Sequence, residues 1–280
     1  MEQQIKLKEI IWEITPECHN NCSYCGSKDL TNLKISNKKI LEIAQLISIY
    51  PPEEINISGG DPLLVDYETH KTIVDMFKLI NTKCKILINP KSYSKKHFKI
   101  LKLYDLIGVS LNNRSEIDIL ENKILEEFKD KIVIITNFNL INVFDYEIIE
   151  EIVSKNNFTW QIQYTMYKKD EEKNAIYKNN KACDYLFEKI QKSIDNNLKI
   201  LLADNMNCGR CSAGLYSLGI TYDGHVIPCL SMRSWYDKNI IEISEGNLQN
   251  ESLEVIWKNK FKKYRFLDFI CCKDICNKPF

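Results

Sequence analysis

Two hydrophobic patterns alternate along this chain. Apolar runs of five or six residues, typical of strands buried in a parallel sheet, are each followed by a longer segment whose apolar residues recur at helical spacing. Ser36 precedes the first helical segment as an N-cap, and Pro51 and Pro52 end it. The predicted strands are 10–14, 54–58, 84–89, 106–111, 131–136 and 159–164, and the predicted helices are 37–50, 67–83, 95–104, 115–129, 146–155 and 182–196.

This succession of strand–helix units predicts an α/β fold with a parallel sheet, because each helix returns the chain to start the next strand in the same direction. Six units indicate an incomplete (β/α)6 barrel. In full barrels the chemistry takes place at the carboxyl ends of the strands, so the residues at those ends are the candidate site. The polar segment 168–181, the segment 204–211 and the hairpin described below are expected to cover the open side of the barrel.

Composition narrows the classes of function. Lys plus Arg and Asp plus Glu both number 38, and this balance argues against a general nucleic-acid-binding protein, which would carry a basic excess. Residues 1–6 lack the layout of a signal peptide, and no apolar run approaches the roughly 18 residues of a membrane span. A cytoplasmic protein is therefore expected. Its 11 cysteines indicate metal binding, because disulfides are rare in a reducing compartment.

Three of these cysteines, Cys18, Cys22 and Cys25, lie just after the first predicted strand. Clustered thiolates are soft ligands that select iron–sulfur clusters, zinc or copper(I). Three ligands leave one coordination position open, as catalytic metal sites do. The alternative is a zinc knuckle in which His19 or a distant residue supplies the fourth ligand.

The spacing CX3CX2C after the first strand, with Tyr24 just before the last cysteine, resembles the signature of the radical S-adenosylmethionine enzymes. The resemblance implies that Cys18, Cys22 and Cys25 hold three irons of a [4Fe–4S] cluster whose fourth iron chelates S-adenosylmethionine. It also implies that an electron from a reductant such as flavodoxin or ferredoxin yields a 5′-deoxyadenosyl radical. This radical would abstract hydrogen from a substrate carbon.

Two further segments carry the same resemblance. Gly59, Gly60, Asp61 and Pro62 follow the second strand and resemble the family motif GGEP, which contacts the amino group of S-adenosylmethionine, with Asp in place of Glu. Paired glycines let a backbone approach a ligand closely. The alternative interpretation is an ordinary Gly-Gly turn. The segment 110–112 looks like the Ser-Leu-Asp of the family near the ribose and methionine. Ser110 and Asn112 are thus implied cofactor contacts, with Asn in place of Asp.

Other polar residues end the remaining strands. Asn89 precedes a proline where the family often has Asn-Gly, which puts a cofactor role for it in doubt. The polar side chains at 136–137 and at 161 and 163 are expected to line the cavity, although each also fits an ordinary polar strand end. Tyr167 and Tyr177 lie in or beside the segment 168–181, where they would suit a peptide substrate.

A second group of cysteines lies in the carboxyl-terminal part of the chain. Two strand-like runs flank Asp223-Gly224, a strong hairpin signal that would bring Cys211 and Cys229 to the same end. The spacing from Cys211 through Gly224 to Cys229 resembles SPASM and twitch domains, which hold auxiliary [4Fe–4S] clusters. A zinc ribbon is the alternative. The implied division is a barrel over residues 1–200 and a small twitch-like auxiliary-cluster domain over residues 201–280.

The number of cysteines limits the number of auxiliary clusters. From residue 208 onward there are six, whereas two clusters ligated wholly by cysteine would need eight, so one auxiliary [4Fe–4S] cluster is expected. Its expected ligands are Cys211, Cys229, Cys272 and Cys276, with Cys208 and Cys271 as competitors. Cys208 is also a candidate hydrogen-atom donor. Cys84 and Cys183 are expected to be small core residues.

Three classes of function remain open. The first is a peptide-modifying enzyme that oxidises, crosslinks or epimerises a ribosomally made peptide, either unaided or with a separate leader-binding protein. The second is a compact small-molecule dehydrogenase that resembles the twitch enzymes that oxidise aminocyclitols. The third is a non-catalytic zinc-binding protein. Leu230 follows Cys229 where sulfatase-maturing relatives have Asp, which argues against that activity.

Overall fold

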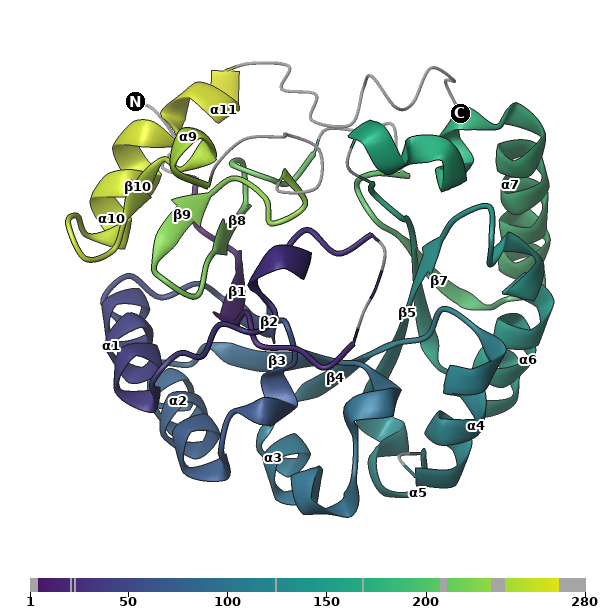
Figure 1. The fold of residues 1–280 in the computed structure, drawn as a ribbon, viewed down its shortest axis with the longest axis horizontal. Helices are drawn as coiled ribbons and strands as arrows, with labels where there is room; N and C mark the ends of the chain where they lie inside the picture. Colours follow the sequence, from purple (N-terminus) through teal and green to yellow (C-terminus); the bar gives the residue numbers. More distant parts are fainter. Residues whose placement is uncertain are drawn as a thin grey trace.

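The computed structural model describes residues 5–266 except 21, 23, 124, 168, 207–210 and 233–239. Within this part of the chain one curved sheet has the strand order β10-β9-β8-β1-β2-β3-β4-β5-β6-β7 (Figure 1). The strands are β1 Glu9–Thr15, β2 Glu54–Gly59, β3 Lys83–Ile88, β4 Leu106–Ser110, β5 Ile132–Phe138, β6 Thr159–Tyr164, β7 Lys199–Leu202, β8 Ser217–Ile220, β9 His225–Ile227 and β10 Gly246–Asn247. From β8 to β7 all neighbours are parallel, whereas β9 and β10 join antiparallel.

Helices cover the convex face of the sheet, as Figure 1 shows. They are α1 Asn37–Ser48, α2 Tyr67–Leu79, α3 Phe98–Leu103, α4 Arg114–Lys123, α5 Leu125–Phe128, α6 Tyr146–Asn156 and α7 Asn180–Asp195. In β1 the residues Ile10, Trp12 and Ile14 are fully buried, as expected of positions that face a helical layer. Because side chains alternate along a strand, Glu9 and Glu13 lie on the concave face. The concave side of β1 therefore carries charged side chains.

The predicted strand–helix succession is confirmed, with one added strand and two altered helices. The structure adds β7, which pairs in parallel with β6. The sequence pattern does not predict this strand, because it has only four residues, of which Lys199 and Leu201 are exposed, so no buried run marks it. The helix predicted over 115–129 is divided into α4 and α5, and the one over 95–104 starts as a 3-10 turn before α3.

The predicted hairpin is confirmed, and it does more than join two cysteines. Strands β8 and β9 pair antiparallel, and Gly224 makes the turn with φ of 88°. In addition, β8 pairs in parallel with β1, with Glu9 opposite Ser217 and Trp12 opposite Ile220. The division into residues 1–200 and 201–280 stays a prediction. The sheet itself is continuous across that boundary, because β7 spans it.

The end of the described chain packs against its beginning. Here lie α9 Ile240–Ile243, α10 Leu253–Val255, the π-helical turn Ile256–Lys260 and α11 Lys262–Phe266. Trp257 is fully buried, packs on Phe261 with ring centroids 5.4 Å apart and donates from Nε1 to the carbonyl oxygen of Ile5 at 3.0 Å. Among the described residues, no helix combines the length and apolar character that crossing a bilayer requires.

Trp257→Ala is therefore expected to lower the free energy of unfolding by about 3–5 kcal/mol, because it leaves a large cavity and an unpaired Ile5 carbonyl. Urea denaturation measures this change. Val255→Ala is the control: Val255 is 44% exposed on the same helical segment, and its truncation should change stability by only about 0.5 kcal/mol. Equal effects of the two substitutions would contradict the docking role of Trp257.

Candidate active site and auxiliary thiol site

The loop after β1 gathers Cys18, Cys22 and Cys25 by backbone hydrogen bonds. The N–H of Cys18 donates to Thr31 at 3.1 Å, and the N–H of Cys25 donates to the carbonyl of Cys22 at 3.2 Å. The N–H of Asn20 also donates to the sulfur of Cys18 at 3.3 Å. All three thiols are half-buried. The loop therefore holds the cysteines on short turns at the carboxyl end of β1.

The three thiols lie close enough to influence one another electrostatically. Burial raises the pKa of Cys22, and the negative charges of Cys25 and Cys18 raise it further, while a hydrogen bond with Tyr24 opposes the shift. The raised pKa favours the protonated thiol. A bound metal would reverse this, because coordination deprotonates a thiol outright. Among the described residues, no three Cys, His, Asp or Glu side chains are already arranged as a metal-ligand set. In chemistry and number the three thiols fit the iron cluster that leaves one iron open.

Tyr24 is fixed from two sides. Its hydroxyl shares a hydrogen bond with Cys22, and its ring meets that of Tyr167 edge-on at a centroid distance of 6.3 Å. Burial raises the pKa of Tyr24 well above its usual range, so the phenol stays protonated and can donate. Tyr167 is only 2% exposed. Its suggested contact with a peptide substrate is therefore not supported, because the side chain is buried and its ring contacts Tyr24. Tyr177 is half-buried and donates to Glu172 at 3.4 Å.

Gly59 and Gly60 bring the end of β2 against the start of the cysteine loop. The N–H of Gly60 donates to Thr15 at 2.7 Å, and the N–H of Asp61 donates to Glu17 at 2.8 Å. A Cβ at Gly60 would lie 2.4 Å from the carbonyl oxygens of residues 16 and 17, and one at Gly59 would lie 2.4 Å from that of Thr15. Gly59 also has φ of 133°, a conformation that favours glycine. The glycines thus have a structural role that the sequence analysis did not assign.

Asp61 and Pro62 follow in a short turn. The carboxylate of Asp61 is 3% exposed and accepts from the N–H of Leu63 at 3.1 Å. The carbonyl of Pro62 hydrogen-bonds His70 Nε2 at 2.9 Å, and His70 Nδ1 hydrogen-bonds the hydroxyl of Tyr104 at 2.6 Å. Burial lowers the pKa of His70 to about 4, so its ring is neutral. His70 is therefore a core residue that supports this turn from below.

The polar residues that end β4, β5 and β6 form one hydrogen-bonded network. Asn112 donates from its side chain to Ser110 at 2.9 Å and accepts from the backbone N–H of Asn137 at 2.9 Å. Gln163 donates to Asn137 at 2.5 Å and accepts from Gln161 at 3.5 Å. Residues that the sequence presented as separate strand ends are thus linked. The linked side chains are hydroxyls and amides, and the carboxylate of Glu116 joins them through the backbone N–H of Asn112.

Two of the strand-end residues, Thr136 and Asn89, have local structural roles. Thr136 was expected to line the cavity, but it is fully buried on the helical side, where it donates to the Leu111 carbonyl at 2.8 Å and accepts from Trp160 at 2.9 Å. Strand alternation explains the difference, because Asn137 takes the concave face and its neighbour takes the other. Asn89 caps the turn after β3 through its side chain, which accepts from the N–H of Lys91 at 2.9 Å.

The sequence analysis missed two buried carboxylates near the cysteine loop. Glu13, on β1, is 2% exposed and accepts from the hydroxyl of Ser27 at 2.7 Å. Glu116, at the start of α4, is 3% exposed and accepts from the N–H of Asn112 at 2.6 Å. Neither belongs to a motif. The one sequence signal for Glu13 is its place as a charged residue within the apolar run 10–14.

Cys211 and Cys229 meet near Asp204, which follows β7. Burial raises the pKa of Cys229, and so do the nearby charges of Cys211 and Asp204; Cys211 donates to Asp204 at 3.7 Å. Cys211 precedes β8 and Cys229 follows its antiparallel partner β9, so both lie near the amino end of β8. That end is the amino end of β1, about 20 Å from the cysteine loop at roughly 3.3 Å per residue. Cys208, Cys271, Cys272 and Cys276 lie outside the described residues.

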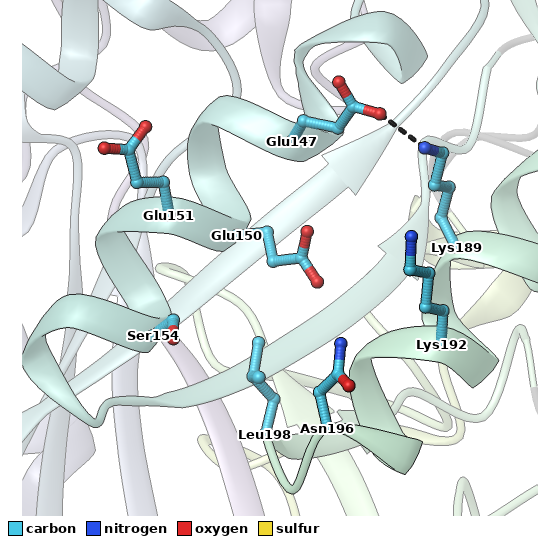
Figure 2. Close-up of a pocket in the computed structure, with 8 residues that line it drawn as sticks. All are labelled: Glu147, Glu150, Glu151, Ser154, Lys189, Lys192, Asn196 and Leu198. Atoms are coloured by element: carbon cyan, nitrogen blue, oxygen red, sulfur yellow. Dashed lines mark hydrogen bonds and ion pairs between the residues drawn. The ribbon is translucent and has the colours of Figure 1, made fainter.

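The remaining cysteines behave as predicted small core residues, since Cys84 and Cys183 are buried. A cavity of about 510 Å³ lies elsewhere, between α6 and α7 on the outside of the molecule (Figure 2). Charged side chains line it, among them Glu147 and Lys189, which form an ion pair. None of the predicted site residues lines this cavity, so it is separate from the candidate active site.

Gly60→Ala is expected to displace the cysteine loop, because the new methyl group would overlap two carbonyl oxygens. The free energy of unfolding should fall by about 1–3 kcal/mol, and the protein should retain less iron after anaerobic reconstitution. Ser58→Ala, two residues earlier on the half-buried concave face, is the matched control and should preserve both quantities. Unchanged stability and iron content in Gly60→Ala would refute the close-contact role.

Comparisons with known proteins agree with this geometry. Residues 211–278 match the SPASM family, an iron–sulfur cluster-binding domain. No curated protein sequence matches the chain. Among solved structures, Streptococcus suis SuiB bound to precursor peptide SuiA superposes with a TM-score of 0.66 at 15% identity, covering 94% of this chain and 67% of that one.

The same SuiB bound to S-adenosylmethionine gives a TM-score of 0.65 at 14% identity over 94% of this chain and 68% of that chain. The enzyme anSMEcpe, with bound AdoMet and the Cp18Cys peptide, gives a TM-score of 0.70 at 14% identity over 92% and 82%. At these identities the likeness concerns the fold. The chain therefore has the fold of the radical S-adenosylmethionine enzymes and carries, over residues 211–278, an iron–sulfur cluster-binding domain of the SPASM family.

Proposed function

We propose that this chain is a radical S-adenosylmethionine enzyme that abstracts hydrogen from a residue of a ribosomally made peptide and thereby oxidises, crosslinks or epimerises it. One observation carries the proposal: a loop with three thiols follows the carboxyl end of β1, and a site with two thiols lies near the amino end of β8, the strand that pairs with β1. A substrate between them would be within reach of both. SuiB and anSMEcpe, which share the fold, have both been solved with peptides bound.

Residues at the carboxyl ends of the strands would bind the cofactor. Cys18, Cys22 and Cys25 would hold three irons, and the bound S-adenosylmethionine supplies the radical chemistry. Tyr24 keeps its proton and donates it in a hydrogen bond to Cys22, which orients that ligand. The expected cofactor contacts are Tyr24, Gly59, Gly60, Asp61, Pro62, Ser110 and Asn112.

The amide network beyond these contacts fits a peptide substrate. Asn112, Asn137, Gln161 and Gln163 offer amide donors and acceptors in the pattern that a peptide backbone also offers. The alternative is a small-molecule dehydrogenase, since hydroxyl groups of a sugar would satisfy the same amides. The proposal also includes reduction by flavodoxin or ferredoxin, a separate leader-binding protein and a cytoplasmic location.

The first expected result concerns the number of clusters. Two [4Fe–4S] clusters amount to about eight irons per chain after reconstitution. Changing Cys18, Cys22 and Cys25 together to Ala should leave about half of this iron and abolish cleavage of S-adenosylmethionine. Iron and sulfide analysis measures the first quantity and chromatography of 5′-deoxyadenosine the second. Twelve irons in the unaltered chain, or zinc in the carboxyl-terminal site, would contradict the proposal.

The second expected result separates the two thiol sites. The proposed cofactor contacts all lie at the carboxyl ends of β1, β2 and β4, so Cys211→Ala with Cys229→Ala should spare uncoupled formation of 5′-deoxyadenosine. It should remove product formation. The control is Cys84→Ala, which removes a buried thiol remote from both sites and should keep both activities if the protein folds. A soluble double variant that retains its first cluster but no longer cleaves S-adenosylmethionine would refute this division.

The substrate class is tested by incubating the reduced enzyme and S-adenosylmethionine with short peptides encoded beside its gene. A peptide mass lower by two hydrogens, or deuterium gained from solvent at one α-carbon, supports peptide modification. The same incubation with an aminocyclitol supplies the comparison. An unaltered peptide together with an oxidised amino sugar would assign the chain to the dehydrogenase class.

A further inference from the structure

The turn after β3 connects two parts of the candidate site that belong to different motifs. This 3-10 turn, Pro90–Ser92, follows directly from Asn89. Ser92 accepts a hydrogen bond at 3.2 Å from the side chain of Asn20, which lies inside the cysteine loop. The adjacent residue Lys91 reaches in another direction, toward α4. A single turn therefore touches both the cysteine loop and the helix that follows β4.

Lys91 pairs with the buried carboxylate of Glu116. The distance from Lys91 Nζ to Glu116 Oε1 is 3.5 Å, and the second oxygen of Glu116 accepts from the backbone N–H of Asn112 at 2.6 Å. The Glu116 side chain is 5% exposed, whereas that of Lys91 is 44% exposed. Because Asn112 also bonds Ser110 and Asn137, contacts continue from Asn20 to the polar network of β4–β6.

Glu116 also lies within electrostatic reach of the cysteine loop. Its negative charge acts on Cys22 and on Tyr24, the two residues that share a hydrogen bond in that loop. A buried charge is screened less than an exposed one, so the carboxylate acts more strongly on the loop than its exposed lysine partner does. The pair therefore does not cancel: its negative member is the one nearer the protein interior.

We propose that Lys91 and Glu116 are positioning residues that hold the cysteine loop against the end of β4 and set the reduction potential of the cluster bound there. This inference rests on the proposed function, since it needs a cluster on Cys18, Cys22 and Cys25. Three thiolates outweigh the charge of an oxidised [4Fe–4S] core, so reduction adds an electron to a site that is already negative. A neighbouring carboxylate makes that reduction harder, and a neighbouring ammonium makes it easier.

The two residues consequently have opposite expected effects. Glu116→Gln keeps the shape of the side chain and its acceptor for Asn112 but removes the negative charge, so the midpoint potential should shift to more positive values. Lys91→Met keeps the length of the side chain but removes the positive charge, so the potential should shift to more negative values. Lys91→Arg keeps the positive charge and should therefore leave the midpoint potential unchanged. A purely structural role would give no such opposition of sign.

The experiment is a redox titration of the reconstituted full chain, followed by electron paramagnetic resonance, without S-adenosylmethionine or substrate. The auxiliary signal is removed by working in the Cys211→Ala and Cys229→Ala background. Lys95→Met and Glu151→Gln, which neutralise one exposed lysine and one exposed glutamate, are the controls and should leave the potential unchanged. Iron analysis of each variant confirms that the cluster is present.

The outcomes are distinguishable. Absence of an iron cluster in the unaltered chain overturns the proposed function and this inference with it. A normal cluster whose potential is unmoved in Lys91→Met, or moves in the same direction in both variants, overturns this inference alone. Because Lys91 is exposed, its substitution stays informative even if Glu116→Gln fails to fold.

Discussion

The arrangement of the candidate site depends on one close approach of two backbones. The end of β2 lies so near the start of the cysteine loop that neither Gly59 nor Gly60 has room for a side chain. The hydrogen bonds of Gly60 and Asp61 to Thr15 and Glu17 then fix the loop before its first cysteine. A loop of this length would otherwise lose considerable conformational entropy on ordering. The glycine pair limits that freedom by attaching the loop to a strand that is already fixed in the sheet.

Three buried carboxylates lie close to the cysteine loop. They belong to Glu13, Asp61 and Glu116, and each accepts a hydrogen bond from a hydroxyl or backbone N–H. Such bonds offset the cost of burying a charge. The side chains that end β4, β5 and β6 are instead hydroxyls and amides, among them Ser110, Asn112, Asn137 and Gln163. Negative charge therefore gathers at the proposed cluster, while the ends of the neighbouring strands offer amides and a hydroxyl.

Local patterns account for what the sequence could predict. The buried runs of the six strands, the spacing of Cys18, Cys22 and Cys25 and the Asp223-Gly224 turn are each set by residues close together in the chain. Non-local contacts account for what it could not. Pairing of β8 with β1 joins segments about 200 residues apart, and no motif marks it. The sequence does not show which of the neighbours Thr136 and Asn137 faces the concave side of the sheet. The contact between Lys91 and Glu116 depends on how two separate βα turns pack together.

The central claim is that three cysteines leave one iron open to S-adenosylmethionine. Electron–nuclear double resonance on the reduced, reconstituted chain with S-adenosylmethionine labelled with ¹⁵N at its amino group tests this most directly. We predict a hyperfine coupling from the labelled nitrogen to the cluster, present in the Cys211→Ala and Cys229→Ala background. A reduced cluster of full iron content that shows no coupling to the label at saturating S-adenosylmethionine would contradict the claim.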